Sequence, residues 1–194
     1  DERPDHVIVF GADHIYRMDP RQMLDFHIEQ GAGVTVAGIR VPAEESFQFG
    51  VIEKADDSGR IVQFHEKNPD APRLADAPHQ VLASMGNYIF NTEFLFEQVI
   101  KDADTPGTQH DFGKNVIPSI IKDYRVFVYP FRDLETQKQA YWRDVGTLDA
   151  YWEANMELVS VTPQLNLYDE KWPIFTHQTQ VPPAKFVFDE QDRR

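Results

Sequence analysis

The chain has 194 residues, enough for one domain with a buried core, and 41% of them are hydrophobic. Its net charge of −13 disfavours nucleic acids and anionic membranes as partners, because phosphate backbones bind to basic surfaces. The absence of cysteine excludes disulfides, thiolate metal sites and cysteine nucleophiles, and no apolar run approaches the ~20 residues that span a bilayer. No signal peptide is visible and the chain starts abruptly before an apolar run, so we expect a piece of a longer, cytoplasmic protein.

The first third of the chain predicts a strand, a helix and a second strand. Val7–Phe10 is a continuous apolar run typical of a strand buried on both faces. Asp19 followed by proline predicts the start of a helix that continues to about Gln30. Val34–Val41 is rich in β-branched residues and predicts a strand. This order predicts a βαβ unit with a right-handed crossover.

The rest of the chain predicts a hairpin, a long strand, further helices and an extended tail. The expected elements are strands over 49–54 and 60–66 joined by a turn at 56–59, an exposed loop over 70–80, a strand over 81–90, a helix over 91–101, a helical stretch over 110–122 split by Pro118, a strand over 124–130 and a helix capped by Thr147. From Gln164 to Arg194 prolines recur without periodicity, which indicates an extended tail or linker.

A small-small-acid step follows the first strand. Gly11 and Ala12 leave room for a ligand, and Asp13 places a carboxylate beside it. Ligands of open α/β sheets lie beyond the carboxyl ends of the strands, and carboxylate oxygens suit hard cations such as Mg²⁺. A local Asx-turn explains Asp13 equally well. Asp144 follows a second strand-like run and, taken alone, is better explained as a helix cap or a partner of Arg143.

Other polar residues stand where a ligand could approach, although each also has a structural explanation. Glu66 and Lys67 offer an acceptor and a donor at a strand end, a pattern more often found at a solvated edge. Ser84 in an apolar strand more often marks a bulge, and Asp111 more often caps a helix. The seven histidines show no metal-ligand spacing, so we interpret His14 as a packing or hydrogen-bonding residue. The chain contains no glycine-rich phosphate loop.

Six short motifs follow one another along the chain. They are Gly11–Tyr16, Phe49–Val51, Phe64–Lys67, Ala83–Phe90, His110–Lys114 and Tyr141–Thr147. Together they resemble the ADP-glucose pyrophosphorylases (glucose-1-phosphate adenylyltransferases), a branch of the sugar-phosphate nucleotidylyltransferases. Tyr168–Ile174 and Pro182–Phe186 resemble the link of that family to a C-terminal β-helix. The resemblance covers nearly the whole chain, and the fourth and sixth motifs favour the ADP-glucose branch over its thymidylyl and uridylyl relatives.

The resemblance implies an α/β fold with a Rossmann-like, mixed, mostly parallel sheet flanked by helices, its N-terminal part missing. Residues 1–160 would form the sugar-phosphate half of a catalytic domain, and residues 161–194 a linker toward an absent β-helix domain. The implied reaction transfers the adenylyl group of ATP to glucose 1-phosphate, giving ADP-glucose and pyrophosphate. This is the first committed step of glycogen or starch synthesis, and the family also implies allosteric control and a homotetramer.

The resemblance also implies residue roles. Asp13 and Asp144 would be the catalytic pair and would hold Mg²⁺ on the substrate phosphates. Lys67 would bind the phosphate of glucose 1-phosphate, and Glu66 a sugar hydroxyl. The other residues implied to bind substrate are Gly50, Ser84, Asp111 and Trp142.

Two departures from the family pattern qualify this expectation. Asn68 stands between Lys67 and Pro69, where relatives have proline at once. The glycine-rich loop for the triphosphate is absent from the chain, so we expect residues 1–194 alone to make no ADP-glucose and to aggregate. The alternatives are a nucleotidylyltransferase for another nucleotide or sugar 1-phosphate, a non-catalytic regulatory subunit, which the presence of Asp13 and Lys67 disfavours, or an unrelated α/β binding module.

Overall fold

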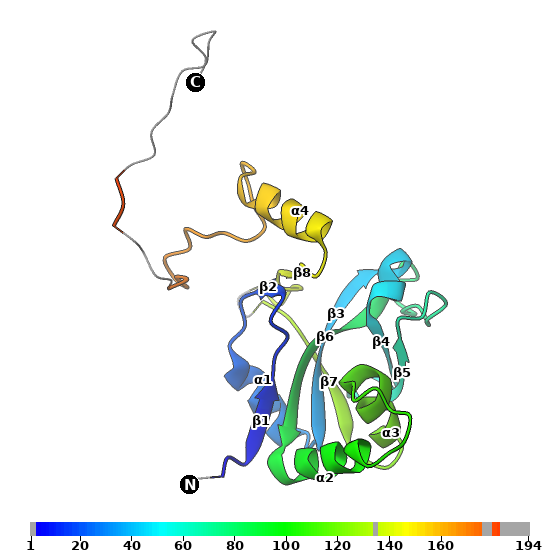
Figure 1. Ribbon diagram of the computed structural model, residues 1–194. Coiled ribbons are helices and arrows are strands. Elements are labelled where there is room, and N and C mark those ends of the chain that lie inside the picture. The colour runs from blue at the N-terminus through cyan, green and yellow to red at the C-terminus, as the bar shows by residue number, and fades with distance from the viewer. Residues whose placement is uncertain (1–2, 134–135, 176–179, 183–194) are drawn as a thin grey trace.

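The computed structural model describes residues 3–133, 136–175 and 180–182, and Figure 1 shows its elements. The strands are β1 His6–Val9, β2 His14–Tyr16, β3 Val34–Pro42, β4 Gly50–Lys54, β5 Ile61–Glu66, β6 Gln80–Asn91, β7 Val126–Pro130 and β8 Trp142–Asp144. The helices are α1 Pro20–Glu29, the 3₁₀ turn η1 Ala43–Gln48, α2 Thr92–Ala103, the π-helical turn η2 Phe112–Val116, α3 Ile117–Ile120 and α4 Leu148–Leu158. None of the described helices is both long and apolar enough to cross a membrane.

Local sequence signals set several of the element boundaries. The carboxylate of Asp19 accepts a hydrogen bond from the backbone N–H of Arg21, and Pro20 occupies the first helical turn of α1. Pro118 lies in the first turn of α3, directly after the π-helical turn η2, so the predicted split of this helical stretch is confirmed. Asp56 accepts from the backbone N–H of Ser58 in the turn between β4 and β5, as expected for the hairpin.

Six strands form one sheet in the order β5-β4-β6-β3-β7, with β1 paired to β6. The α/β class is confirmed, but the sheet is mostly antiparallel: β3 and β7 form the one parallel ladder among the described strands. β1 and β3 still run in the same direction, because both pair antiparallel with β6, which lies between them. The predicted βαβ unit therefore spans an intervening strand. A continuous apolar segment indicates that a strand is buried, but it does not indicate whether the neighbouring strands are parallel or antiparallel to it.

β6 is the long central strand, and its partner changes along one edge. Beside β3 it is paired from Gln80 to Ser84 and again from Tyr88 to Phe90, with a register shift between the two stretches where Ser84 predicts a bulge. On its other edge it pairs with β4 at Ala83 and with β1 from Tyr88 onward. Ser84 and Gly86 thus lie between two partner strands, at a break in the sheet.

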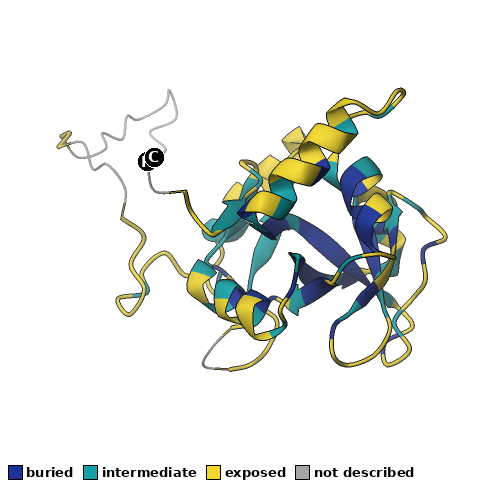
Figure 2. Cartoon of the chain, turned by 90° about the horizontal axis from the view of Figure 1, so that it is seen from below, coloured by how far each residue is buried: buried dark blue, intermediate teal, exposed yellow. Residues whose placement is uncertain are grey.

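Each face of the sheet packs against helices. Val36, Phe90 and Ile120 belong to an apolar cluster on the face covered by α2 and α3. Met23 and Met85 belong to the cluster on the face covered by α1. Figure 2 shows the buried residues concentrated in the strands and on the inner sides of these helices. This burial is the main stabilising contribution to the fold.

The structure does not show β1 as a strand buried on both faces. All four residues of β1, His6–Val9, are half-buried, and Phe10 is 45% exposed. β1 pairs with β6 on one side, and no described strand pairs with its other side. The apolar run is therefore placed at an edge of the sheet.

A second, two-stranded sheet lies beyond the end of the large one and consists of β2 and β8. We call it the ribbon; α4 and the following residues lie on its far side (Figure 1). No described helix or strand follows α4, as expected for an extended tail, although Leu165 in this segment is buried. Most of the last family-like motif, from Pro183 to Phe186, lies outside the described residues.

Candidate functional site

The ribbon brings together two carboxylates that are far apart in the sequence. His14 of β2 is paired with Asp144 of β8, which places Asp13 beside Asp144. The backbone N–H of Val145 donates to the carbonyl of Asp13 at 2.9 Å and locks this register. One ligand atom each from Asp13, His14 and Asp144 lies within 4.8 Å of the other two.

Gly146 lies beside the two carboxylates and leaves the space between them open. Its backbone N–H donates to Asp144 Oδ1 at 2.9 Å. A methyl group added at Gly146 would lie 3.2 Å from Asp144 Oδ1 and 3.3 Å from Asp13 Oδ2, so a side chain here would crowd both acids. Two converging carboxylates repel each other unless a cation lies between them. The donor set therefore fits a divalent cation.

His14 is fixed against this pair by its surroundings. Its Nε2 lies 3.5 Å from Asp13 Oδ1, and its side chain is only 13% exposed. A methyl group added at Gly11 would lie 2.7 Å from its Cε1 and would displace the ring, and one added at Gly86 would lie 3.2 Å from the same atom, a tight contact. The imidazole also packs edge-on against Trp142, with the ring centroids 5.3 Å apart.

A second cluster surrounds Glu66 at the end of β5. Gly50 is its direct partner in β4. Methyl groups added at Gly50 and at Gly113 would each lie 2.8 Å from Glu66 Oε2. Asp111 caps the π-helical turn by accepting from the backbone N–H of Lys114 at 2.8 Å, which confirms the capping interpretation. It also acts electrostatically on Glu66, so the cap and the candidate ligand-binding role coexist.

The electrostatics of this cluster favour a ligand that brings hydroxyl donors. Burial, and secondly the charge of Asp111, raise the pKa of Glu66, while Lys67 and Lys114 act in the opposite direction. Burial raises the pKa of Tyr88 to about 12; a hydrogen bond with Ser84 opposes this rise, and the two acids add to it. Two carboxyl groups and a neutral phenol lie together here, with the lysines beside them.

Lys67 occupies a turn that directs the chain away from β5. Its φ is 49°, in the left-handed region, and its backbone N–H donates to the carbonyl of Phe49 at 2.9 Å. A lysine in this conformation is strained by roughly 1–3 kcal/mol. Such strain is often found where a side chain has a functional position, and Lys67 is one of the predicted phosphate-binding residues.

The two clusters are neighbours. Phe49 packs against Trp142 with ring centroids 5.5 Å apart, and Trp142 in turn contacts His14. Gly86, two residues after Ser84, lies against the same histidine. The break in the sheet beside β6 thus connects the carboxylate pair on one side with the Glu66 cluster on the other. Every residue predicted to act in the site lies in or beside one of these clusters.

Sequence reasoning missed three residues of this region. Tyr88 was not selected, although it shares a β6 face with Ser84 and could have been found by the two-residue periodicity of a strand. Gly113 was not selected because its role depends on the approach of Glu66 from another element. His14 was interpreted as a packing or hydrogen-bonding residue, and it does pack against Trp142; its position beside both Asp13 and Asp144 was not predicted, because the histidines show no metal-ligand spacing.

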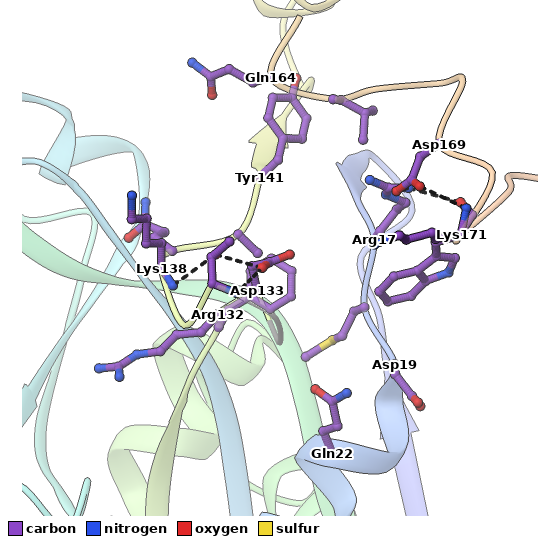
Figure 3. A pocket seen from close by; sticks show the side chains of 17 residues that line it. Arg17, Asp19, Gln22, Arg132, Asp133, Lys138, Tyr141, Gln164, Asp169 and Lys171 are labelled. Atoms are coloured by element: carbon purple, nitrogen blue, oxygen red, sulfur yellow. Dashed lines mark hydrogen bonds and ion pairs between the residues drawn. The ribbon is translucent and has the colours of Figure 1, made fainter.

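A sizeable cleft lies away from both clusters. It measures about 650 Å³ and lies between the end of β2, the segment after β7 and the residues after α4 (Figure 3). Arg17 donates to Asp169 at 2.9 Å and to the carbonyl of Trp172 at 3.0 Å, which attaches the tail to the ribbon. None of the predicted site residues lines this cleft, whereas Trp142 and Asp144 line a cleft of about 470 Å³. Size alone therefore does not identify the site.

Comparisons with known proteins agree with the geometry. Residues 1–161 match the family described as nucleotidyl transferase. The chain is 58% identical over 195 residues to a glucose-1-phosphate adenylyltransferase of Teredinibacter turnerae, which covers 100% of the chain and 46% of the relative. Relatives with the same name from Methylococcus capsulatus and Saccharophagus degradans are 54% and 56% identical, over 98% and 100% of the chain. The chain thus spans about half the length of the curated relatives it matches.

Proposed function

Because the chain belongs to the nucleotidyl transferase family, we propose that it takes part in transferring the adenylyl group of ATP to glucose 1-phosphate, giving ADP-glucose and pyrophosphate. The observation that supports this most is the meeting of Asp13 and Asp144 across the ribbon, beside the Glu66 cluster. A cation site next to a pocket of hydroxyl acceptors and lysines is what such a transfer requires.

The proposed mechanism assigns the carboxylate pair to the reacting phosphates. Asp13 and Asp144 would hold Mg²⁺, which, when bound, neutralises the charge that develops on phosphorus. Gly146 contributes by leaving the space between the two acids open and by orienting Asp144 through its N–H. The sugar phosphate oxygen attacks the α-phosphorus in line, and no covalent enzyme intermediate is needed.

The Glu66 cluster would bind the sugar phosphate. Glu66, Asp111 and Ser84 accept or exchange hydrogen bonds with sugar hydroxyls, and Lys67 pairs with the phosphate. Trp142 closes the pocket on the side of the cation; its buried Nε1 has no hydrogen-bond partner among the described residues and can donate to a ligand. Binding both reactants in one orientation removes much of the entropic barrier to the reaction.

The same proposal includes properties that the family resemblance implies for the whole protein. These are a cytoplasmic location, a role in glycogen or starch synthesis, allosteric control and a homotetrameric assembly. It also includes the expectation that residues 1–194 alone do not turn over, because no glycine-rich loop for a triphosphate is present in them.

A chimaeric enzyme tests the proposed function. Residues 1–194 would replace the aligned segment of the full-length Teredinibacter turnerae relative, and pyrophosphate release would be measured with ATP and a panel of sugar 1-phosphates. We expect turnover with glucose 1-phosphate, at least ten times more efficient than with the mannose, galactose or N-acetylglucosamine analogues.

The unmodified relative is the matched control, and residues 1–194 alone form the third arm. A folded chimaera without turnover would indicate a non-catalytic chain and contradict the proposal. Preference for another sugar 1-phosphate would contradict the substrate assignment. Turnover by residues 1–194 alone would show that the triphosphate site is misplaced.

A further inference from the structure

We propose that His14 is a third protein ligand of the cation held between Asp13 and Asp144, and that its nitrogen raises the affinity of the site for Mn²⁺ and Co²⁺ relative to Mg²⁺. The inference rests on the proposed function, which assigns a divalent cation to the two carboxylates. It reverses the sequence-based interpretation of His14 as a packing residue.

The distances among the three side chains suit a common ion. One ligand atom of each lies within 4.8 Å of the others, and His14 Nε2 is 3.5 Å from Asp13 Oδ1. Two neighbouring ligands that each bind an ion at about 2.1 Å are about 3.0–3.4 Å apart in octahedral or tetrahedral geometry. The histidine and the first carboxylate are therefore already at nearly the required separation.

The imidazole is held in place without a cation. Gly11 and Gly86 leave just enough room for it, and Gly86 achieves this with a φ of 72°, which disfavours any residue with a side chain. Trp142 packs against the ring from a third direction. The buried Nδ1 has no hydrogen-bond partner among the described residues, whereas Nε2 faces Asp13 Oδ1 at 3.5 Å. In the tautomer that carries its proton on Nδ1, the lone pair of Nε2 points toward the carboxylates. Nε2 can therefore present its lone pair to an ion.

The negative charge of Asp13 and Asp144 also favours a cation between them. Within the part of the chain that the structure describes, no lysine or arginine is paired with Asp13 or Asp144. The nearby Arg143 pairs instead with Glu153 and Glu157 of α4. The two carboxylates carry a charge that a divalent cation neutralises.

The ligand set determines which cation is favoured. Mg²⁺ prefers oxygen ligands and retains several waters, whereas imidazole nitrogen suits transition metals. With His14 as a ligand, the site has two oxygens and one nitrogen. The substitution His14→Asn would remove the nitrogen ligand, because the shorter amide does not reach the position of Nε2 and leaves that position to a water oxygen. It should therefore reduce the preference for transition metals more than it reduces Mg²⁺ binding.

Pulsed electron paramagnetic resonance of bound Mn²⁺ provides the test. The chimaera described above would be loaded with Mn²⁺ alone, without nucleotide, and examined for nitrogen hyperfine modulation. We expect modulation from one imidazole nitrogen, its loss in His14→Asn and its retention in His79→Asn. The last variant is the matched control, because His79 is exposed and lies outside the cluster.

Competition titrations add a thermodynamic readout. His14→Asn should weaken Mn²⁺ binding at least ~10-fold and Mg²⁺ binding less than ~3-fold, whereas His79→Asn should change neither. Absence of nitrogen modulation in the unsubstituted protein would overturn the inference without any variant having to fold. Equal weakening of both metals, with no nitrogen signal, would make His14 a positioning residue and also overturn it.

The outcomes separate this inference from the proposed function. ADP-glucose synthesis by a chimaera whose Mn²⁺ shows no nitrogen ligand would overturn the role of His14 alone. A nitrogen-ligated Mn²⁺ in a folded chimaera without synthesis would overturn the proposed function and leave the ligand assignment standing.

Discussion

The large sheet and the ribbon hold adjacent halves of the candidate site, and they do so by different forces. The sheet places Glu66, Ser84 and Gly50 on strands whose interior residues, such as Phe90 and Val51, are fully buried. The ribbon consists of two strands of three residues, all half-buried. It is connected to α4 by the ion pair Arg143–Glu153 and to the tail by the ion pair Arg17–Asp169, which Figure 3 shows.

This difference separates stability from chemistry. Buried apolar surface contributes about 25 cal/mol per Å² to folding, whereas an exposed ion pair contributes roughly 0–1 kcal/mol. The sheet therefore determines whether the protein folds. The ribbon contributes little to folding but carries the acids. Substitutions in the two regions should accordingly change different measurements, and the following predictions test that separation.

The largest expected effect is on the rate. In the chimaera, Asp13→Asn should lower kcat at least ~10³-fold, because it removes a main electrostatic contact to the transition state. The melting temperature should remain unchanged, since Asp13 is exposed and asparagine is nearly the same size. Steady-state kinetics with a circular dichroism control provide the measurement; activity within tenfold of the parent would rule out the cation-binding role.

The next effect is on stability and concerns the sheet. Phe90→Ala should lower the free energy of unfolding by about 3–5 kcal/mol, because Phe90 is fully buried and its removal leaves a cavity. Phe175→Ala is the matched control, with a side chain that is 92% exposed, and should change stability little. Urea denaturation of both variants compares them. Equal losses would show that the tail, too, contributes to the core.

A smaller effect is expected on sugar phosphate binding at the end of β5. Lys67→Ala should raise KM for glucose 1-phosphate about 10- to 150-fold, the equivalent of one charged hydrogen bond of roughly 1.5–3 kcal/mol. KM for ATP should change far less. Lys122→Ala, at an exposed position outside both clusters, is the control. Similar shifts for both substrates would count against the assignment.

The smallest effect is a dependence of stability on pH. Burial lowers the pKa of His27, whose ring bonds Thr35 at 2.8 Å and Asn91 at 3.1 Å beside His6. Its folded pKa lies below the unfolded one, so the unfolded state binds more protons and stability falls as pH drops below about 6.5.

The slope from this one group cannot exceed about 1.4 kcal/mol per pH unit. Urea denaturation between pH 5 and 8 measures it, and His27→Gln should flatten the curve. If the free energy of unfolding of His27→Gln varied with pH as steeply as that of the parent, groups other than His27 would be responsible for the pH dependence. Asp13→Asn should leave this slope unchanged, because His27 is a buried residue of α1 and not part of the ribbon.

Much of the fold could be predicted from local sequence. The Asp19 cap, the turn at Asp56 and the break at Pro118 were predicted, because each depends on contacts within a few residues. The α/β class was predicted, but the expectation of a mostly parallel sheet was wrong, since most of the strands pair antiparallel. A buried run such as Val81–Phe90 has the same composition whether its neighbouring strands are parallel or antiparallel. The burial of Val7–Phe10 was overestimated for the same reason: composition does not show whether a strand lies at an edge.

The sequence by itself determined which residue types were available: acids after strand-like runs, a lysine at a strand end, and glycines where side chains must approach closely. Only the tertiary structure decided that Asp13 and Asp144 meet, that His14 faces them, and that Gly113 makes room for Glu66. Strands of three residues carry too little periodicity to predict their pairing. Their register depends on backbone hydrogen bonds between distant segments, and those form only once the apolar sheet has brought the segments together.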